Sequence, residues 1–274
     1  MNITENLIEM ALYEDIFQMD ITTESLIDPD LEGNAVIIAK ESLLLAGIDI
    51  AEKVFHRLDK NIIINKKKSD GKWCEKNTEI AAISGKIDKL LMAERTAVNF
   101  LQHLSGIATL VSKYVKVLSN SKTKIVDTRK TTPGLRYLEK YAVRIGGANN
   151  HRMGLYDGVL IKDNHIAACG GIFEAVSKIK KSVHHLMKIE IEVENINQVR
   201  QALDADADVI MLDNMNIEQI KEAVKIINKR AVVEVSGGIN IDHIPLIANC
   251  GVDIISIGAL THSARAVDIS MKIL

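Results

Sequence analysis

The chain has 274 residues, of which 47% are hydrophobic and 26% charged, and its formal net charge is −2 at pH 7. This composition fits a globular protein of one large or two moderate domains, and it excludes a general nucleic-acid binder, which usually carries a basic excess. We find no stretch of about 18 uncharged apolar residues and no basic leader before a long apolar run, so we expect neither membrane spanning nor secretion. The three cysteines, Cys74, Cys169 and Cys250, are far apart, which argues against a disulfide framework or a zinc site and favours a reducing cytoplasm.

The first 115 residues mix helical and strand patterns without a regular repeat, which predicts an α+β unit. Ile3, Leu7 and Ala11 are spaced four apart and predict one face of an N-terminal helix. Short apolar runs that predict strands lie at residues 35–39, 43–46 and 62–64. Residues 86–118 have helical periodicity, and Ser105-Gly106 predicts a break between two helices that join the two halves of the chain.

The second half alternates short β-branched runs with helical stretches, which is typical of βαβ units and a parallel sheet. The predicted strands are residues 124–126, 159–161, 189–193, 209–212, 232–235 and 254–257. A barrel and a doubly wound sheet both fit this pattern. Because a full eight-unit barrel takes about 250 residues, we expect a shortened barrel with six or seven strands.

Charged or small polar residues follow every one of these six runs. They include Asp127-Thr128-Arg129-Lys130, Lys162-Asp163-Asn164, Glu194-Asn195, Asp213-Asn214, Ser236-Gly237-Gly238 and Ser256-Ile257-Gly258. The C-terminal strand ends of a β/α barrel carry its active site, so the sequence predicts a site there. The last two segments bear glycines that let backbone N–H groups approach a phosphate, although two tight turns would explain either one alone.

Eight cations lie in the segment from Lys122 to Arg152, against only Asp127 and Glu139, so the segment predicts a site for a small polyanion. The eight are Lys122, Lys124, Arg129, Lys130, Arg136, Lys140, Arg144 and Arg152. Arginine forks bind carboxylates or phosphates bidentately, and lysine supplies a compact charge. Arg136, Lys140 and Arg144 are at helical spacing and are predicted to form a solvated helix face. Arg129, Lys130 and Arg152 lie beside strand ends or turns and are predicted, with His151, to bind the anion.

Carboxylates near the strand ends predict a second function at the same site. Glu192 and Glu194 share a face of one strand and Asp213 ends the next, where carboxylates can hold ribose hydroxyls, ligate Mg²⁺ or stabilise a cationic transition state. Charge balance alone also explains them. Lys162 is compatible with anion binding and with a Schiff base. The four histidines His103, His165, His243 and His262 are expected to be structural.

The segment from Asp127 to His165, DTRKTTPGLRYLEKYAVRIGGANNHRMGLYDGVLIKDNH, closely resembles the central signature of the quinolinate phosphoribosyltransferase family. Supporting matches are ERTAVNFLQHLSGIAT (94–109), EIEVEN (190–195), DVIMLDN (208–214), EVSGGI (234–239) and GVDIISIGALTHSARAVDIS (251–270). The resemblance covers nearly the whole chain. It implies transfer of phosphoribosyl from phosphoribosyl pyrophosphate to quinolinate with decarboxylation, giving nicotinate mononucleotide, pyrophosphate and CO₂ for NAD biosynthesis.

The resemblance also implies an architecture and an assembly. We expect an N-terminal α/β sandwich with its linking helix over residues 1–115 and an open β/α barrel over residues 116–274, with a C-terminal helix packing back on the first domain. We further expect Mg²⁺ bound with phosphoribosyl pyrophosphate, and a homodimer or higher assembly in which Arg95 reaches the neighbouring site.

Site residues follow from the family's motifs, position by position. Arg129, Thr131, His151, Arg152 and Lys162 are expected to bind substrate, mainly the quinolinate carboxylates, together with Arg95. Lys130 and Lys162 are also expected to contact the phosphoribosyl donor, and Glu192 and Asp213 its ribose hydroxyls and metal, so that Lys130, Lys162, Glu192 and Asp213 form the catalytic set. The 5′-phosphate is assigned to two loops, Ser236-Gly237-Gly238 and Ser256-Ile257-Gly258.

One segment departs from the family's pattern, and two rival functions stay open. Phe17, Gln18 and Met19 stand where the family usually has glycines around an acidic residue, which puts the local turn in doubt. A molybdenum-associated relative of the family is one rival, although the intact segments 150–157 and 161–165 favour the quinolinate enzyme. The other is a Schiff-base lyase using Lys162, whereas a non-catalytic phosphosugar-binding regulator is expected to have lost part of the charged set.

Overall fold

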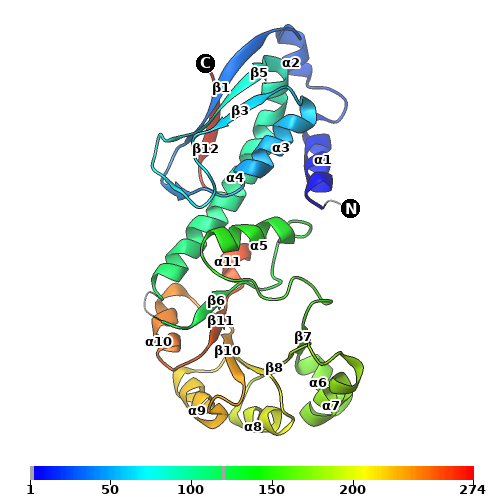
Figure 1. The fold of residues 1–274 in the computed structure, drawn as a ribbon, viewed down its shortest axis with the longest axis vertical. Helices are drawn as coiled ribbons and strands as arrows, with labels where there is room; N and C mark the ends of the chain where they lie inside the picture. The colour runs from blue at the N-terminus through cyan, green and yellow to red at the C-terminus, as the bar shows by residue number, and fades with distance from the viewer. Residues whose placement is uncertain (1–2, 119–120) are drawn as a thin grey trace. The chain divides into compact units, whose positions relative to one another are not determined.

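A computed structural model describes residues 3–118 and 121–274, which form two compact units (Figure 1). Among these residues, the first unit contains 3–112, 131–147 and 259–274, and the second contains 113–118, 121–130 and 148–258. The expected single boundary after residue 115 does not anticipate the two later segments of the first unit. Among the described residues, no helix combines the length and the apolar character that crossing a bilayer requires.

The first unit is built on a four-stranded antiparallel sheet in the order β12-β1-β5-β3. Its strands are β1 (Glu32–Ala39), β3 (Ile63–Lys66), β5 (Glu79–Lys86) and β12 (Ile269–Ile273). The C-terminal segment was expected to be a helix, and this prediction is wrong. Ile269 and Met271 are buried while Lys272 is exposed, and this alternation with period two lets the segment pair with β1 as a strand.

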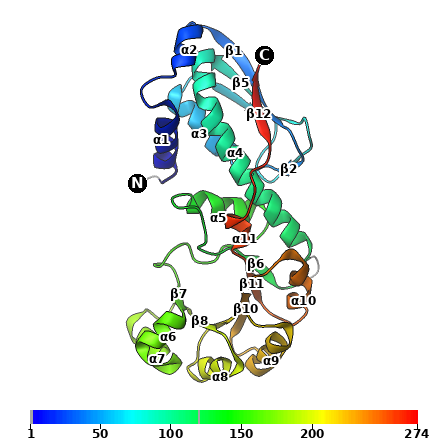
Figure 2. The same ribbon diagram turned by 180° about the vertical axis from the view of Figure 1, so that it is seen from behind.

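Helices cover one face of this sheet. In both ribbon views α3 (Ile48–Leu58) and α4 (Ile87–Lys116) run along it (Figures 1 and 2). The other elements of the unit are α1 (Ile3–Ile16), α2 (Ile21–Leu26), α5 (Arg136–Ile145), α11 (Ala259–His262) and a two-stranded sheet of β2 (Leu43–Leu44) and β4 (Trp73–Cys74). The predicted sandwich of helices on a sheet is therefore present.

The predicted break at Ser105-Gly106 is wrong, because α4 continues through both residues as one helix of 30 residues. A Cβ atom on Gly106 would lie 2.2 Å from the backbone oxygen of Arg265, so the glycine allows that segment to pack against the helix. The Ser105 hydroxyl accepts a hydrogen bond from the Ala46 amide at 3.0 Å. Both residues thus serve long-range packing and do not form a turn.

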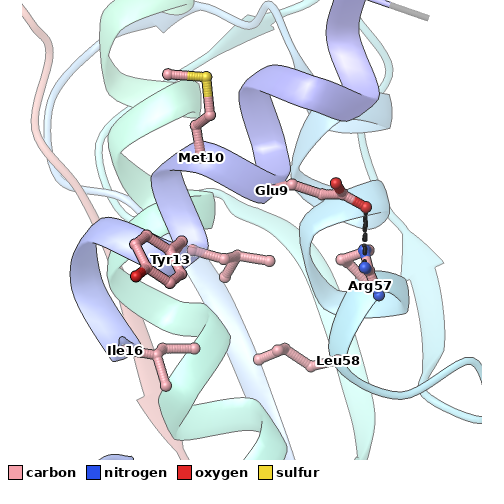
Figure 3. A pocket seen from close by; sticks show the side chains of 7 residues that line it. Glu9, Met10, Tyr13, Ile16, Arg57 and Leu58 are labelled. Atoms are coloured by element: carbon pink, nitrogen blue, oxygen red, sulfur yellow. Dashed lines mark hydrogen bonds and ion pairs between the residues drawn. The ribbon is translucent and has the colours of Figure 1, made fainter. Parts of the chain in front are cut away.

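Helix α1 forms as predicted but buries a neighbouring stripe. Ile8 and Leu12 are buried, whereas Ile3 is 54% exposed. Because both stripes are apolar at a spacing of four, the sequence alone could not choose between them. Figure 3 shows a groove beside α1 that also involves Arg57 of α3, whose Nη2 lies 2.9 Å from Glu9 Oε1.

The segment that departs from the family's pattern follows α1. Phe17 has φ of +48°, a left-handed conformation that favours glycine. Its ring packs edge-to-face on Tyr13, with the centroids 5.2 Å apart, and the side chain of Asp20 then caps α2. The turn is thus made without glycine, and an aromatic contact accompanies the strained residue.

The second unit is a parallel sheet of six described strands in the order β6-β11-β10-β9-β8-β7. Its strands are β6 (Lys124–Val126), β7 (Val159–Ile161), β8 (Ile189–Val193), β9 (Val209–Asp213), β10 (Val232–Ser236) and β11 (Ile254–Ser256). All six lie within one residue of the predicted runs. Since β6 and β7 are the two edges, the sheet is open and not closed into a barrel.

The helices between these strands are α6 (Asp163–Cys169), α7 (Ile172–Ser182), α8 (Ile196–Asp204), α9 (Ile217–Ile227), the 3₁₀ turn η1 (Ile241–His243) and α10 (Ile244–Ala248). Figure 1 shows α8 and α9 side by side on the outer side of the sheet, and Figure 2 agrees. The open β/α barrel is confirmed over the doubly wound alternative.

Candidate active site

The register of the parallel sheet sorts its side chains into two faces. Paired residues of parallel strands point to the same side and successive residues alternate, so Glu192, Met211 and Glu234 share one face. Glu190 stands two residues before Glu192, and Asp213 two residues after Met211, so both lie on that face as well. The opposite face is buried and apolar and consists of Ile191, Val193, Ile210, Leu212, Val233, Val235 and Ile255. The polar side chains therefore gather on the first of these faces, the one with Glu192 and Glu234, which we call the inner face.

The strand ends of this inner face carry three predicted residues. Lys162, which follows β7, forms an ion pair with Glu192 of β8. Asp213 ends β9 and accepts a hydrogen bond from Asn214 Nδ2 at 2.7 Å. A carboxylate partner suits a charged, anion-binding ammonium, whereas a Schiff-base lysine reacts as the neutral amine. The arrangement thus favours electrostatic binding over a covalent lysine.

The buried carboxylate of Asp127 fixes the position of the segment that carries His151. Asp127 follows β6 and is fully buried, and it accepts hydrogen bonds from Asn150 Nδ2 at 2.6 Å and from the His151 amide at 2.9 Å. Asn149 forms a parallel bridge with Val126 of β6. The chain that returns after α5 is thereby fixed beside β6, and this brings His151 and the residue after it to the inner face.

Arg152 carries the strongest sign of an anion site. Its Nη1 donates to the Gly158 carbonyl at 2.8 Å, but its Nε is buried and makes no hydrogen bond to any described residue. Burial and the positive charge of Arg129 lower the pKa of Arg152. A buried donor without an acceptor is costly, and a planar anion with two oxygens would satisfy it and relieve the repulsion between the two arginines.

His151 is engaged by the protein through both ring nitrogens. Nδ1 accepts a hydrogen bond from the Arg152 amide at 2.8 Å, and Nε2 lies 3.1 Å from Glu190 Oε2 and 3.6 Å from Glu234 Oε1. The sequence-based assignment gave His151 a direct contact with a substrate carboxylate. Its ring also faces two buried carboxyl groups of the protein, and the contact with substrate stays a prediction.

Glu190 and Glu234 were not predicted as site residues. They are 8% and 2% exposed, and burial, followed by the charge of Glu190, raises the pKa of Glu234 to about 7. One signal could have revealed them, because each stands two residues before a residue that was assigned to the site, Glu192 and Ser236 respectively. In a strand, such residues share a face.

The two glycine-bearing loops differ in what they expose. Gly237 has φ of +97°, and a Cβ atom there would meet the Asn214 side chain at 2.2 Å, so only glycine fits. Ser256, by contrast, is 2% exposed, and the Ile257 amide donates to the Val126 carbonyl at 3.0 Å. The Ile257 amide, which was predicted to bind phosphate, is therefore already used within the sheet.

The remaining predicted residues lie at the edges of the site or in the first unit. Arg129 is half-buried and Lys130 is exposed, and the Lys130 amide donates to Thr128 Oγ1 at 3.0 Å. Thr131 belongs to the first unit, where its hydroxyl accepts from Arg136 Nε at 2.9 Å. Arg95 is exposed on α4 in the same unit.

The prediction of a solvated helix face is wrong for Lys140. Lys140 is fully buried, as is its neighbour Glu139, so only Arg144 of the three is exposed. Glu139 accepts from the Thr132 amide at 3.2 Å and lies 2.9 Å from His103 Nε2. His103 therefore has the structural role that was expected of it.

Models of two domains of one protein family match this chain. The quinolinate phosphoribosyl transferase N-terminal domain matches residues 20–105, and the C-terminal domain matches residues 107–272. A probable carboxylating nicotinate-nucleotide pyrophosphorylase of Bacillus subtilis is 44% identical over 269 residues, which covers 98% of this chain and 93% of that protein. A relative in Methanocaldococcus jannaschii with the same name is 44% identical and covers 97% of this chain and 96% of its own length.

Solved structures agree in fold. The nicotinate-nucleotide pyrophosphorylase of Francisella tularensis has a TM-score of 0.95 and 44% identity, with 100% of this chain and 96% of that chain covered. The enzyme of the same name from Ehrlichia chaffeensis gives a TM-score of 0.94 at 44% identity, with 98% of each chain covered.

Proposed function

The chain belongs to the quinolinate phosphoribosyltransferase family, and we propose that it transfers phosphoribosyl from phosphoribosyl pyrophosphate to quinolinate. The products are nicotinate mononucleotide, pyrophosphate and CO₂. The observation that carries this proposal is Arg152, whose buried Nε lacks an acceptor beside a second arginine. A pyridine dicarboxylate supplies the planar oxygens that such a pair binds.

The acidic strand ends suit the other substrate. Departure of pyrophosphate leaves positive charge on the ribose, which the carboxylates of Glu192 and Asp213 stabilise. Lys162, paired with Glu192, holds negative charge at the same edge. Once the pyridine nitrogen carries the ribose it is positive, and this charge stabilises the carbanion left by decarboxylation while the cations fix the orientation of the ring.

We include Mg²⁺ in the proposal as a partner of phosphoribosyl pyrophosphate. Glu192 and Asp213 lie on neighbouring strands of one face and offer the hard oxygen ligands that Mg²⁺ takes, directly or through water. The ion would neutralise charge on the leaving pyrophosphate. Activity that survives exhaustive treatment with EDTA would count against this part.

A homodimer that works in the cytoplasm completes the proposal. Arg95 is exposed, as a residue that reaches a neighbouring subunit must be, and Cys74, Cys169 and Cys250 are all free thiols. The test mixes two inactive variants, Arg95→Ala and Arg129→Ala. If Arg95 acts in the neighbouring site, mixed dimers recover up to about a quarter of normal activity, since one of two sites is intact in half of the dimers. No recovery would contradict the shared site.

The decisive experiment measures the reaction itself. Purified protein with Mg²⁺, quinolinate and phosphoribosyl pyrophosphate should form nicotinate mononucleotide and release CO₂ in equal amounts, and omission of the phosphoribosyl donor should abolish both. Absence of product would refute the proposal. The Schiff-base alternative is not favoured by the family match or by the ion pair of Lys162, and borohydride trapping with a carbonyl substrate should give no adduct.

A further inference from the structure

A buried cluster lies on the inner face, below the strand ends to which the proposed reaction assigns its substrates. It consists of His151, Glu190 of β8 and Glu234 of β10, whose potential ligand atoms all lie within 4.8 Å of one another. Both carboxyl groups are more than nine-tenths buried, and one oxygen of each has no hydrogen-bond partner among the described residues. Such groups are costly to bury unless they are paired with, or hydrogen-bonded to, one another.

The contacts indicate how the cluster is arranged. Because Nδ1 of His151 accepts the Arg152 amide, the ring proton belongs on Nε2, which faces Glu190 at 3.1 Å. Glu234 lies close to both groups, since its carboxylate oxygen, one of Glu190 and a ring nitrogen of His151 are all within 4.8 Å of one another. The cluster therefore packs two buried carboxyl groups against the imidazole, with Nε2 3.1 Å from Glu190 Oε2 and 3.6 Å from Glu234 Oε1.

The cluster is linked to the anion site through the backbone. His151 accepts the amide of Arg152, and Asp127 accepts the amide of His151, so the ring and the carboxylate together fix the chain where the Arg152 side chain departs. The guanidinium is then held by one contact to the Gly158 carbonyl. Movement of the ring would move the start of that side chain.

We propose that Glu234 is a positioning residue that acts with Glu190 to hold the His151 ring, and that through this ring it orients Arg152 toward a carboxylate of the substrate. The inference rests on the proposed function for the identity of that substrate, but the arrangement of the ring can be tested without it. A buried divalent cation held by the same three side chains is the competing occupant.

The test uses Glu234→Gln, which keeps the shape of the side chain and removes its acidity. The KM for quinolinate should rise about tenfold while kcat changes less than threefold, because Arg152 binds the carboxylate in the ground state as well as in the transition state. In an Arg152→Ala background the same change should add less than threefold, since the two residues act through one path. Glu222→Gln, an exposed substitution on α9, is the matched control and should change neither constant.

A second measurement does not depend on activity. The ¹⁵N resonances of the His151 ring in the ligand-free protein should move in Glu234→Gln and stay in Glu222→Gln. If the wild-type protein makes no nicotinate mononucleotide, the proposed function fails while this measurement still tests the positioning. Unchanged ring resonances, or a lowered melting temperature with an unchanged KM, would overturn the inference.

Two further results bear on the inference. Stoichiometric metal in the purified protein that is lost in Glu234→Gln would make the cluster a metal site and overturn the positioning role. If Glu234→Gln does not fold, Glu190→Gln removes the other carboxylate and should raise the KM in the same way. A wild-type KM in Glu190→Gln would also overturn the inference.

Discussion

Arg129 lies in the loop after β6, and its positive charge contributes to the lowered pKa of Arg152, so the two guanidinium groups act on the same region. Replacement of Arg129 by alanine should lower kcat/KM at least about 100-fold, or roughly 3 kcal/mol, because the substrate dicarboxylate would lose a bidentate partner. Steady-state kinetics with both substrates measure this effect.

The control for Arg129→Ala is Arg200→Ala, which removes an exposed arginine from α8 in the same unit. That variant should keep normal kinetics, and both variants should keep the circular dichroism of the wild type. Near-normal turnover in Arg129→Ala would remove this arginine from the site.

At Phe17 we predict an effect on stability and none on kinetics. Its φ of +48° penalises any residue with a Cβ atom, so glycine should be more stable than alanine at this position by about 1 kcal/mol. The comparison of Phe17→Gly with Phe17→Ala cancels the lost contact with the Tyr13 ring. Urea unfolding midpoints of the two variants measure the difference, and an alanine variant that is the more stable would contradict the conformation.

At the scale of residues, the sequence predicted the rim of the site and missed the layer below it. Lys162, Glu192 and Asp213 were assigned to the site because each stands at or beside a strand end, where the rule for β/α barrels applies. Glu190 and Glu234 lie inside strands, and the side chains that surround them come from distant segments. Lys140 was misplaced for a related reason, since helical spacing does not indicate which face another element will cover.

Helix α4 shows how packing reverses an intrinsic preference. In an ordinary helix, alanine is about 1 kcal/mol more favourable than glycine, but at Gly106 the added Cβ would meet the Arg265 oxygen at 2.2 Å. Gly106→Ala should therefore lower the melting temperature by several degrees, as overpacking typically costs about 1–3 kcal/mol. Lys113→Ala, an exposed change in the same helix, should leave it nearly unchanged. A more stable Gly106→Ala variant would show that the two segments do not pack closely.

At the scale of elements, the six parallel strands were predictable because each is a short apolar run that ends in a polar residue. The C-terminal strand was missed although residues 267–273 alternate apolar and polar in the sequence, and its partner β1 lies more than 200 residues away. Distant partners also explain the wrong prediction at Ser105-Gly106, whose contacts are at residues 46 and 265.

The order of the chain across the whole molecule follows from these long-range pairings. The first unit takes its sheet from both ends of the sequence, because β12 pairs with β1, while the parallel sheet of the second unit is formed by residues 124–256. Residues near the C-terminus therefore stabilise the unit that the N-terminal half begins. No pattern in composition or charge marks such an exchange.

The stability of the whole protein should depend on pH through Glu234. Its pKa is raised from 4.5 to about 7 in the folded protein, mainly by burial, so the folded state binds this proton more tightly than the unfolded chain does. The resulting stabilisation is complete below about pH 4.5 and is lost as the pH rises through about 7, by up to about 3 kcal/mol. Glu234→Gln is neutral at every pH and avoids the loss. Relative to wild type, the urea midpoint of Glu234→Gln should therefore rise between about pH 5 and pH 8, and an equal difference at both pH values would show that Glu234 does not titrate in this range.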